Sequence, residues 1–278
     1  MTEWDVGDDV QKQQMAIRHY CNHLVSLSLC ITDPDKSGNL VKRPFAFSGF
    51  VMSVRGHWNL VTAGHIVREL DTALSNPKAA LTSCVLRDEW GSNSKFKGPV
   101  FPPFDYQGAP KVALYDKELG IDFAFIGLSP FYQEQLQRNN IRAISEQNWV
   151  FQGNVKFSEY FVLGLPTEMT IRNEDIFIPV PVIVPLTKID PIPENYKKPF
   201  PQFVGKIFEN VTLTDMDGMS GGPIIGIGDG GDGKRRYWIV AVQSSWFSRE
   251  RVILGCPVPI FAGMIERLVQ EIVESEDE

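Results

Sequence analysis

The stretch Asp215-Met216-Asp217-Gly218-Met219-Ser220-Gly221-Gly222-Pro223 holds a serine among glycines, between two segments that are rich in strand-forming residues. A serine hydroxyl is a weak nucleophile at neutral pH, so it needs a base to accept its proton and donors to stabilise an oxyanion. Gly218 can adopt backbone angles that aim its amide, together with that of Ser220, into one small pocket. Glycine-rich turns between strands are common, so this stretch alone does not identify a nucleophile. The rest of the chain must supply the base and the residue that orients it.

The composition limits the classes of protein to consider. The chain has 278 residues, of which 43% are hydrophobic and 22% charged, so it can form one or two compact domains. Its net charge of −7 argues against a nucleic-acid partner, and Lys234-Arg235-Arg236 is too short to change that. No run approaches the roughly 20 apolar residues of a membrane span, and the N-terminus is acidic. We therefore expect a cytoplasmic protein with no membrane partner, in agreement with four scattered cysteines, Cys21, Cys30, Cys84 and Cys256.

The first half of the chain has alternating, strand-like segments after a polar N-terminal arm over residues 1–19. The runs 45–54 and 58–63 predict a hairpin. The hairpin ends in Gly64-His65, and helical spacing follows from Ile66 to Leu74. His65 is therefore expected at a strand-to-helix corner, where the scaffold fixes the backbone while the side chain is exposed.

A carboxylate stands at the start of another apolar run. Asp122 precedes Phe123-Ala124-Phe125-Ile126-Gly127-Leu128, which predicts a buried strand. A carboxylate at the entrance to a core needs a partner, because an unpaired buried charge is expensive. Asp116 and Asp105 are the alternatives for the same role.

The second half is also rich in strand-like runs. Residues 129–148 are polar and indicate a linker, and strand-like segments begin again at Trp149. Seven prolines between 179 and 201 make that region a poor central strand, so we expect an edge strand or an excursion there. From Pro259 onward the apolar residues recur every three to four positions, which predicts an amphipathic C-terminal helix.

Two clusters could hold metals, but both are weak. His19, Cys21 and His23 could share one face of a strand, yet a fourth ligand at a familiar spacing is missing. Gly228-Asp229-Gly230-Gly231-Asp232-Gly233 indicates a hairpin tip, with too few carboxylates for a calcium loop. We expect no metal and no cofactor.

His65, Asp122 and Ser220 occur in an order that resembles a known family. Thr62-Ala63-Gly64-His65 resembles the histidine motif of the chymotrypsin-fold, trypsin-like serine proteases, Ile121-Asp122-Phe123-Ala124-Phe125 their aspartate motif, and Gly218-Met219-Ser220-Gly221-Gly222-Pro223 their nucleophile motif. Gly255-Cys256-Pro257-Val258-Pro259 is further similar to the HtrA/Deg-type branch, here without a PDZ domain. The resemblance implies an all-β fold of two six-stranded antiparallel barrels with a C-terminal helix. Residues 20–135 would form the first barrel, and residues 136–278 the linker, second barrel and helix.

The resemblance also implies a serine endopeptidase that forms an acyl-enzyme on Ser220. His65 would act as general base and then general acid, while Asp122 would fix its tautomer and stabilise the imidazolium. The backbone amides of Gly218 and Ser220, flanking Met219, would form the oxyanion hole.

The resemblance to this family also implies where the substrate pocket lies. Thr214, six positions before the nucleophile, would lie at its base next to Asp215, with Gln243, Ser244 and Ser245 along one wall. These residues would offer backbone to an extended protein or peptide substrate. A neutral base predicts a preference for uncharged side chains, which the adjacent Asp215 could reverse.

Met219 departs from the pattern of the digestive and clotting proteases, which carry an aspartate before the nucleophile. That aspartate pairs with a new N-terminus after cleavage, so activation by this route is not expected here. Ordering of the oxyanion loop would instead depend on an activating protein partner or on the region 167–215.

Two other functions fit part of the pattern. The first is a catalytically inactive binding or scaffold protein of the same fold. The second is another acyl-transfer enzyme such as an esterase, but α/β esterases place the nucleophile before a helix, whereas Ile224-Ile225-Gly226-Ile227 predicts a strand.

Overall fold

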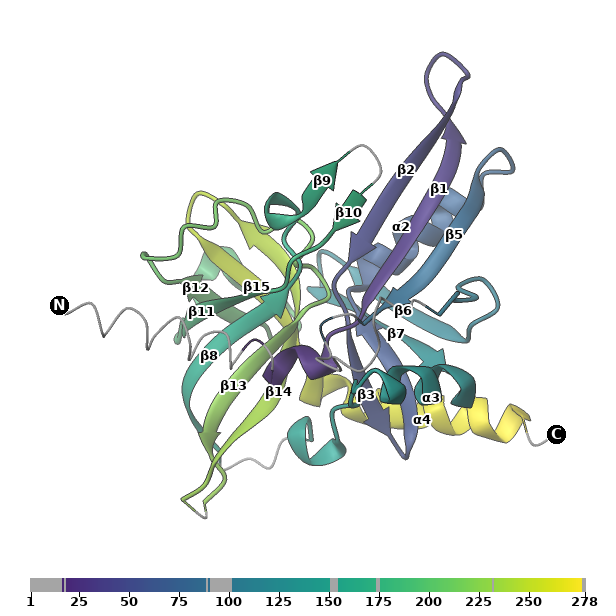
Figure 1. Cartoon of the computed structure of the whole chain (residues 1–278). Coiled ribbons are helices and arrows are strands. Elements are labelled where there is room, and N and C mark those ends of the chain that lie inside the picture. The colour runs from purple at the N-terminus through teal and green to yellow at the C-terminus, as the bar shows by residue number, and fades with distance from the viewer. Residues whose placement is uncertain are drawn as a thin grey trace, which may run out of the picture.

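The structure is a computed structural model, and it describes residues 17, 19–88, 90, 102–150, 155–173, 176–231 and 233–276. Most of the expected N-terminal arm, residues 1–16 and 18, lies outside the described residues. The chain is mostly β-structure with few helices, and strands occupy both halves (Figure 1).

The elements of the first half follow the hairpin and corner that the sequence predicts. In chain order they are η1 (Cys21–His23), β1 (Ser26–Pro34), β2 (Leu40–Phe47), β3 (Phe50–Val54), β4 (His57–Thr62), α2 (Gly64–Leu74), β5 (Ala80–Arg87), β6 (Lys111–Asp116), β7 (Ile121–Leu128) and α3 (Pro130–Arg138).

The second half contains most of the remaining strands and the C-terminal helix. Its elements are η2 (Glu146–Asn148), β8 (Lys156–Gly164), η3 (Thr167–Met169), β9 (Ile171–Asn173), β10 (Ile176–Ile178), β11 (Val182–Lys188), η4 (Glu194–Tyr196), β12 (Phe203–Ile207), β13 (Pro223–Asp229), β14 (Arg235–Phe247), β15 (Val252–Pro257) and α4 (Val258–Glu276).

Six strands of the second half close into a barrel, in the order β11-β12-β15-β14-β13-β8. All of its pairings are antiparallel. Alternate side chains point inward and form one apolar cluster, which includes Val162, Val184, Ile224 and Ile253. The six-stranded antiparallel barrel expected in this half is therefore confirmed.

The first half differs from the expected closed barrel. Its strands form a four-stranded sheet, β3-β4-β7-β6, and a three-stranded sheet, β2-β1-β5. A single bridge between Leu24 and Phe50 links the start of β1 to the other sheet, so the two sheets do not merge into one ladder. The β1–β2 hairpin extends away from the body (Figure 1). A second closed barrel is thus not confirmed.

A shared apolar core joins the two halves. Phe50, Val61 and Phe123 from the first half lie in one cluster with Phe161 and Val242 from the barrel. Helix α4 begins at the edge of the barrel near β14 and runs beneath the first half (Figure 1), and its Phe261 stacks on Phe123 with ring centroids 5.1 Å apart. Because burial of large aromatic side chains is strongly stabilising, this core fixes the two halves relative to each other.

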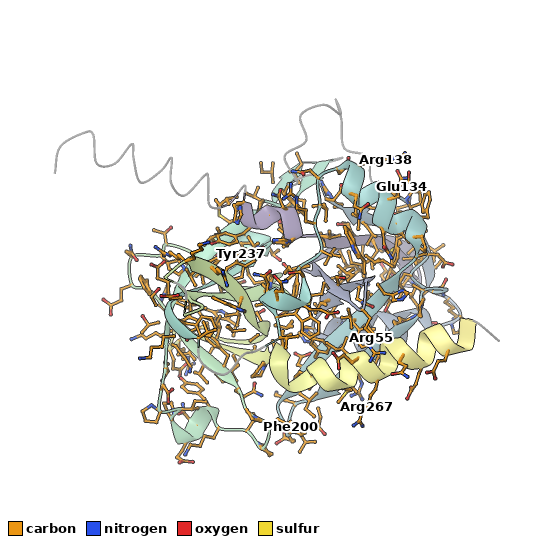
Figure 2. The ribbon with its side chains drawn as sticks, turned by 90° about the horizontal axis from the view of Figure 1, so that it is seen from below. Arg55, Glu134, Arg138, Phe200, Tyr237 and Arg267 are labelled. Atoms are coloured by element: carbon orange, nitrogen blue, oxygen red, sulfur yellow. The ribbon has the colours of Figure 1, made fainter. Side chains whose placement is uncertain are left out.

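Helix α4 confirms the expected amphipathic C-terminal helix. Phe261 and Ile265 are buried, whereas Met264 is exposed. Figure 2 shows Arg55 beside α4, where its guanidinium donates to Gln270 at 3.2 Å. None of the helices in the described ranges combines the length and the apolar character needed to cross a membrane.

One expectation about the proline-rich region is wrong. Val182–Lys188 is a full member of the barrel, where we expected an edge strand or an excursion. Strand β11 pairs with β8 over Val182–Leu186 and with β12 only from Leu186 onward, so Pro185 is paired on one side and its missing N–H can be tolerated. Residues 189–202 do form an excursion, held at its base by buried Tyr196 against Phe247.

Candidate active site

His65 lies at the predicted corner, where β4 ends and α2 begins. Gly64 brings this corner close to strand β6 of the same sheet, because a Cβ atom there would lie 2.1 Å from the Leu114 carbonyl oxygen. The close approach places His65 against the start of β7. The His65 backbone amide donates to Asp122 Oδ1 at 2.8 Å, and the His65 Nδ1–H donates to Asp122 Oδ2 at 2.7 Å. The second bond leaves Nε2 as the basic nitrogen of the neutral ring.

Asp122 is almost fully buried, and both of its carboxylate oxygens are used by His65. Its backbone amide donates to the thiol sulfur of Cys256 at 3.0 Å. Burial raises the pKa of the Cys256 thiol to about 12, so the group facing Asp122 is a neutral thiol. The alternative carboxylates are engaged elsewhere: Asp105 accepts from Gly108, and Asp116 accepts from the amides of its own turn.

The environment of His65 favours its protonated form. Burial alone lowers the pKa of the imidazole, but the hydrogen bond and the negative charge of Asp122 outweigh burial, with a smaller contribution from Glu69. The net result is a pKa above the ordinary value of 6.5. A base of this strength suits proton acceptance near neutral pH.

The Ser220 loop packs directly on the strand that leads to His65. Gly221 has a φ of +88°, and a Cβ there would lie 2.2 Å from Thr62 Oγ1. The Gly221 amide donates to the Gln243 carbonyl at 2.8 Å, and the Gln243 amide donates to the Gly222 carbonyl at 2.9 Å. Ser220 is partly exposed between these anchors. Within the described part of the chain, its hydroxyl makes no hydrogen bond to His65.

The two expected oxyanion donors are unoccupied. Among the described residues, neither the Gly218 amide nor the Ser220 amide donates to a protein group. Gly218 adopts a φ of +89°, which only glycine accepts readily. Its carbonyl accepts a hydrogen bond from the Ser48 hydroxyl at 2.6 Å. The assignment of these two amides to an oxyanion hole stays a prediction.

Met219, between those two donors, is fully buried in the barrel core. It packs with Leu213, Met216 and Ile224, and its sulfur lies close to Gly164. The residue before the nucleophile is thus anchored by apolar burial where an aspartate would need an ion pair.

Ser48 is a functional residue that the sequence analysis missed. It is fully buried, and its hydroxyl donates to Gly218 while accepting from the Leu165 amide at 2.9 Å. It ties the nucleophile loop to the end of β8. No sequence signal could have identified it, because Ser48 and Gly218 are 170 positions apart.

Thr214 and Asp215, expected at the base of a substrate pocket, are both hydrogen-bonded to Glu168. Thr214 is exposed, and Glu168 accepts hydrogen bonds from its hydroxyl at 2.7 Å and from the Asp215 amide at 2.9 Å. These bonds, first of all that from the Thr214 hydroxyl, lower the pKa of Glu168. Glu168 therefore holds the start of the nucleophile loop, and the assignment of Thr214 as pocket base stays a prediction.

A cavity of about 380 Å³ opens beside the His65–Asp122 pair. Ser244 and Ser245 line it, whereas Gln243 is buried beneath the nucleophile loop. Thr214 and Asp215 do not line it. The cavity borders the base on one side and strand β14 on another, which is where an extended peptide could lie.

Of the two weak candidate metal clusters, the first does not lie on a strand as expected, and the second lies at the expected hairpin tip. Cys21 and His23 belong to the short helix η1, so they do not share a strand face with His19. The two ring nitrogens of His23 bond to the Arg142 carbonyl and the Tyr237 hydroxyl. Asp229 accepts from the amides of Gly231 and Gly233 at a hairpin tip, as predicted, and Asp232 lies outside the described residues. In the ranges described, no three His, Cys, Asp or Glu side chains gather as a metal site.

Comparisons with known proteins add little. No protein-family profile matches the chain, and no curated sequence matches it. Among solved structures, neuropsin, a serine protease expressed in the limbic system of mouse brain, aligns with 91% of this chain and 96% of its own. The identity is 12% and the TM-score 0.47, too low to establish a shared fold or activity. The functional argument therefore rests on the residues themselves.

Proposed function

We propose that the chain is a serine endopeptidase that hydrolyses protein or peptide substrates through an acyl-enzyme on Ser220. His65 Nε2 accepts the hydroxyl proton as the oxygen attacks the carbonyl carbon, and the resulting imidazolium returns the proton to the leaving amine. Asp122 orients the ring through Nδ1 and stabilises the imidazolium. The amides of Gly218 and Ser220 hold the oxyanion, and water then repeats the sequence to release the acyl group.

The observation that carries this proposal is the double contact between His65 and Asp122, at 2.8 Å and 2.7 Å, just after the end of strand β4, where Gly221 of the Ser220 loop packs on Thr62. Two bonds from backbone and ring fix both the position and the tautomer of the imidazole, which is what a general base requires. In resting enzymes the bond between nucleophile and base is often long, so the missing Ser220–His65 bond is compatible with catalysis.

The esterase alternative is disfavoured by the element that follows the nucleophile. Ser220 is followed by Gly221-Gly222 and then by strand β13, as the sequence predicted, rather than by a helix. The inactive scaffold of the same fold is the outcome to be separated by experiment. The proposal also includes membership of the HtrA/Deg-type branch, a cytoplasmic location and an uncharged residue at the cleaved position, and the residues before the new N-termini in the library digest below test the last of these.

The test is digestion of a diverse peptide library, followed by identification of new N-termini by mass spectrometry. Wild type should generate new termini, whereas Ser220→Ala at the same concentration should generate none. A matched control is Ser53→Ala, a partly buried serine remote from the site that should retain full cleavage. Cleavage that persists in Ser220→Ala, or no cleavage by folded wild type, would refute the proposal.

A further inference from the structure

The cavity beside His65 and Asp122 has walls from three separate parts of the chain. The first half contributes residues 115–117 and 120–122, and the barrel contributes 244–247 and Leu254. The third wall comes from the excursion between β11 and β12, through Lys198 and Gln202.

The excursion is fixed against the first half by one backbone hydrogen bond and one side-chain hydrogen bond. The Phe200 amide donates to the Leu119 carbonyl at 3.0 Å, and Gln202 Nε2 donates to the Gly120 carbonyl at 2.6 Å. Figure 2 shows Phe200 at the outer edge of the molecule, on the barrel side. These contacts hold the excursion against the β6–β7 turn, two residues before Asp122.

Gly120 creates the room that one lysine occupies. It has a φ of +82°, and a Cβ there would lie 2.6 Å from Lys198 Cβ and 2.8 Å from Lys198 Cγ. The aliphatic stem of Lys198 therefore lies directly on the turn, and the side chain is half-buried. Packing of the stem restricts where the ammonium group can go, which lowers the entropy cost of using it as a ligand.

Two positive charges at this cavity lack an internal partner. Among the described residues, Lys117 and Lys198 form neither an ion pair nor a hydrogen bond, although adjacent Lys197 pairs with Glu194. The cavity also contains two carboxylates. Asp122 is bonded to His65, and Asp116 Oδ1 accepts from two amides of its own turn.

We propose that this cavity recognises an acidic side chain, Asp or Glu, on a substrate residue close to the cleaved bond, through Lys117 and Lys198. The inference rests on the proposed protease function and names its substrate class. The acidic residue would lie at a position that flanks the cleaved bond. It is not the residue whose carbonyl carbon Ser220 attacks, for which an uncharged side chain is proposed above. Lys117 and Lys198 both line the cavity that contains the His65–Asp122 pair, and an ammonium group forms a charge-assisted hydrogen bond with a carboxylate.

The expected effect is moderate, because Lys117 is exposed and Lys198 only half-buried. Ion pairs of this kind change an equilibrium about twofold to fivefold each. Together the two lysines should favour Glu over Gln by about tenfold in kcat/KM, and the preference should shrink at high salt because the charges are screened.

The test uses pairs of fluorogenic peptides that carry Glu or Gln at each position flanking the cleaved bond in turn. Wild type, Lys117→Gln, Lys198→Gln, the double variant and the control Lys197→Gln are compared by kcat/KM at low and high salt. We expect one position where wild type and Lys197→Gln favour Glu, a reduced preference in each single variant, and none in the double variant. The inference is overturned if wild type favours Glu at no position, or if the double variant keeps the preference.

If the proposed protease function fails, the recognition of an acidic side chain can still be tested by binding. If wild type cleaves nothing and Ser220 does not react with a fluorophosphonate, binding of the same peptides is measured by fluorescence anisotropy. Tighter binding of a Glu peptide than its Gln counterpart, lost in the double variant, would support recognition without catalysis. Equal binding would overturn the recognition as well.

Discussion

Truncation of Met219 should disconnect the nucleophile loop from the barrel core. Met219→Ala removes three side-chain heavy atoms from a fully buried site. At about 0.8 kcal/mol for each methylene-sized group, the lost transfer free energy is about 2.4 kcal/mol. The unfilled cavity raises the expected loss in unfolding free energy to about 2–5 kcal/mol. Because residue 219 lies between the two oxyanion donors, loosening it by about 1 Å should slow the reaction of Ser220 about tenfold to hundredfold.

The assay compares urea unfolding with the second-order rate of fluorophosphonate labelling, under conditions where every variant is folded. Leu186→Ala is the matched control, because Leu186 is buried in the same core on strand β11. It should lose similar unfolding free energy with little change in the labelling rate. Met219→Leu, which conserves volume, should retain most of both. Equal labelling rates for Met219→Ala and Leu186→Ala would refute the anchoring argument.

Three further predictions concern the base, the corner and the control of activity. The rate of Ser220 labelling should rise with pH through the raised pKa of His65. Asp122→Asn should lower the labelling rate by up to about 10⁴-fold, and it should move the pH at which the rate rises to a lower value. Since the folded-state pKa of His65 is raised, its contribution to stability is present below the unfolded pKa and lost as pH rises through the folded value. Urea unfolding of wild type and Asp122→Asn across this range checks that sign. Gly64→Ala places a Cβ 2.1 Å from the Leu114 oxygen, so it should lower the unfolding free energy by about 1–3 kcal/mol or more and slow labelling, as measured by the same two assays. With Met219 buried and its loop hydrogen-bonded within one chain, the purified protein should label without an added partner. A labelling rate that rises more than tenfold with cell extract would instead favour an activating partner.

Local patterns in the sequence were sufficient to place the base and its neighbour. Alternation followed by helical spacing predicted that His65 stands at a corner, and an apolar run predicted that Asp122 begins a buried strand. Each of these signals depends on residues within about ten positions. The sequence could not show that Glu168 would hold Thr214, or that Ser48 would hold Gly218, because those contacts join segments far apart in the chain.

The same limit explains where the observed strands differ from the expected fold. Alternation identifies a strand but not its neighbours, so it could not distinguish two sheets in the first half from a closed barrel. Pro185 argued against a barrel strand because the sequence cannot show that β11 changes partner at Leu186. The excursion that carries Lys198 was anticipated, but its docking on the β6–β7 turn depends on long-range hydrogen bonds from the Phe200 amide and the Gln202 side chain, which leave no local pattern.

The most direct test of the central claim is covalent labelling with a fluorophosphonate, followed by intact-mass measurement and peptide mapping. The account predicts one adduct per chain, located on Ser220, absent from Ser220→Ala and formed at least about a hundredfold more slowly in His65→Ala. The control Ser53→Ala should label like wild type. An adduct on another residue, equal labelling of Ser220→Ala, or no labelling of folded wild type would contradict the account.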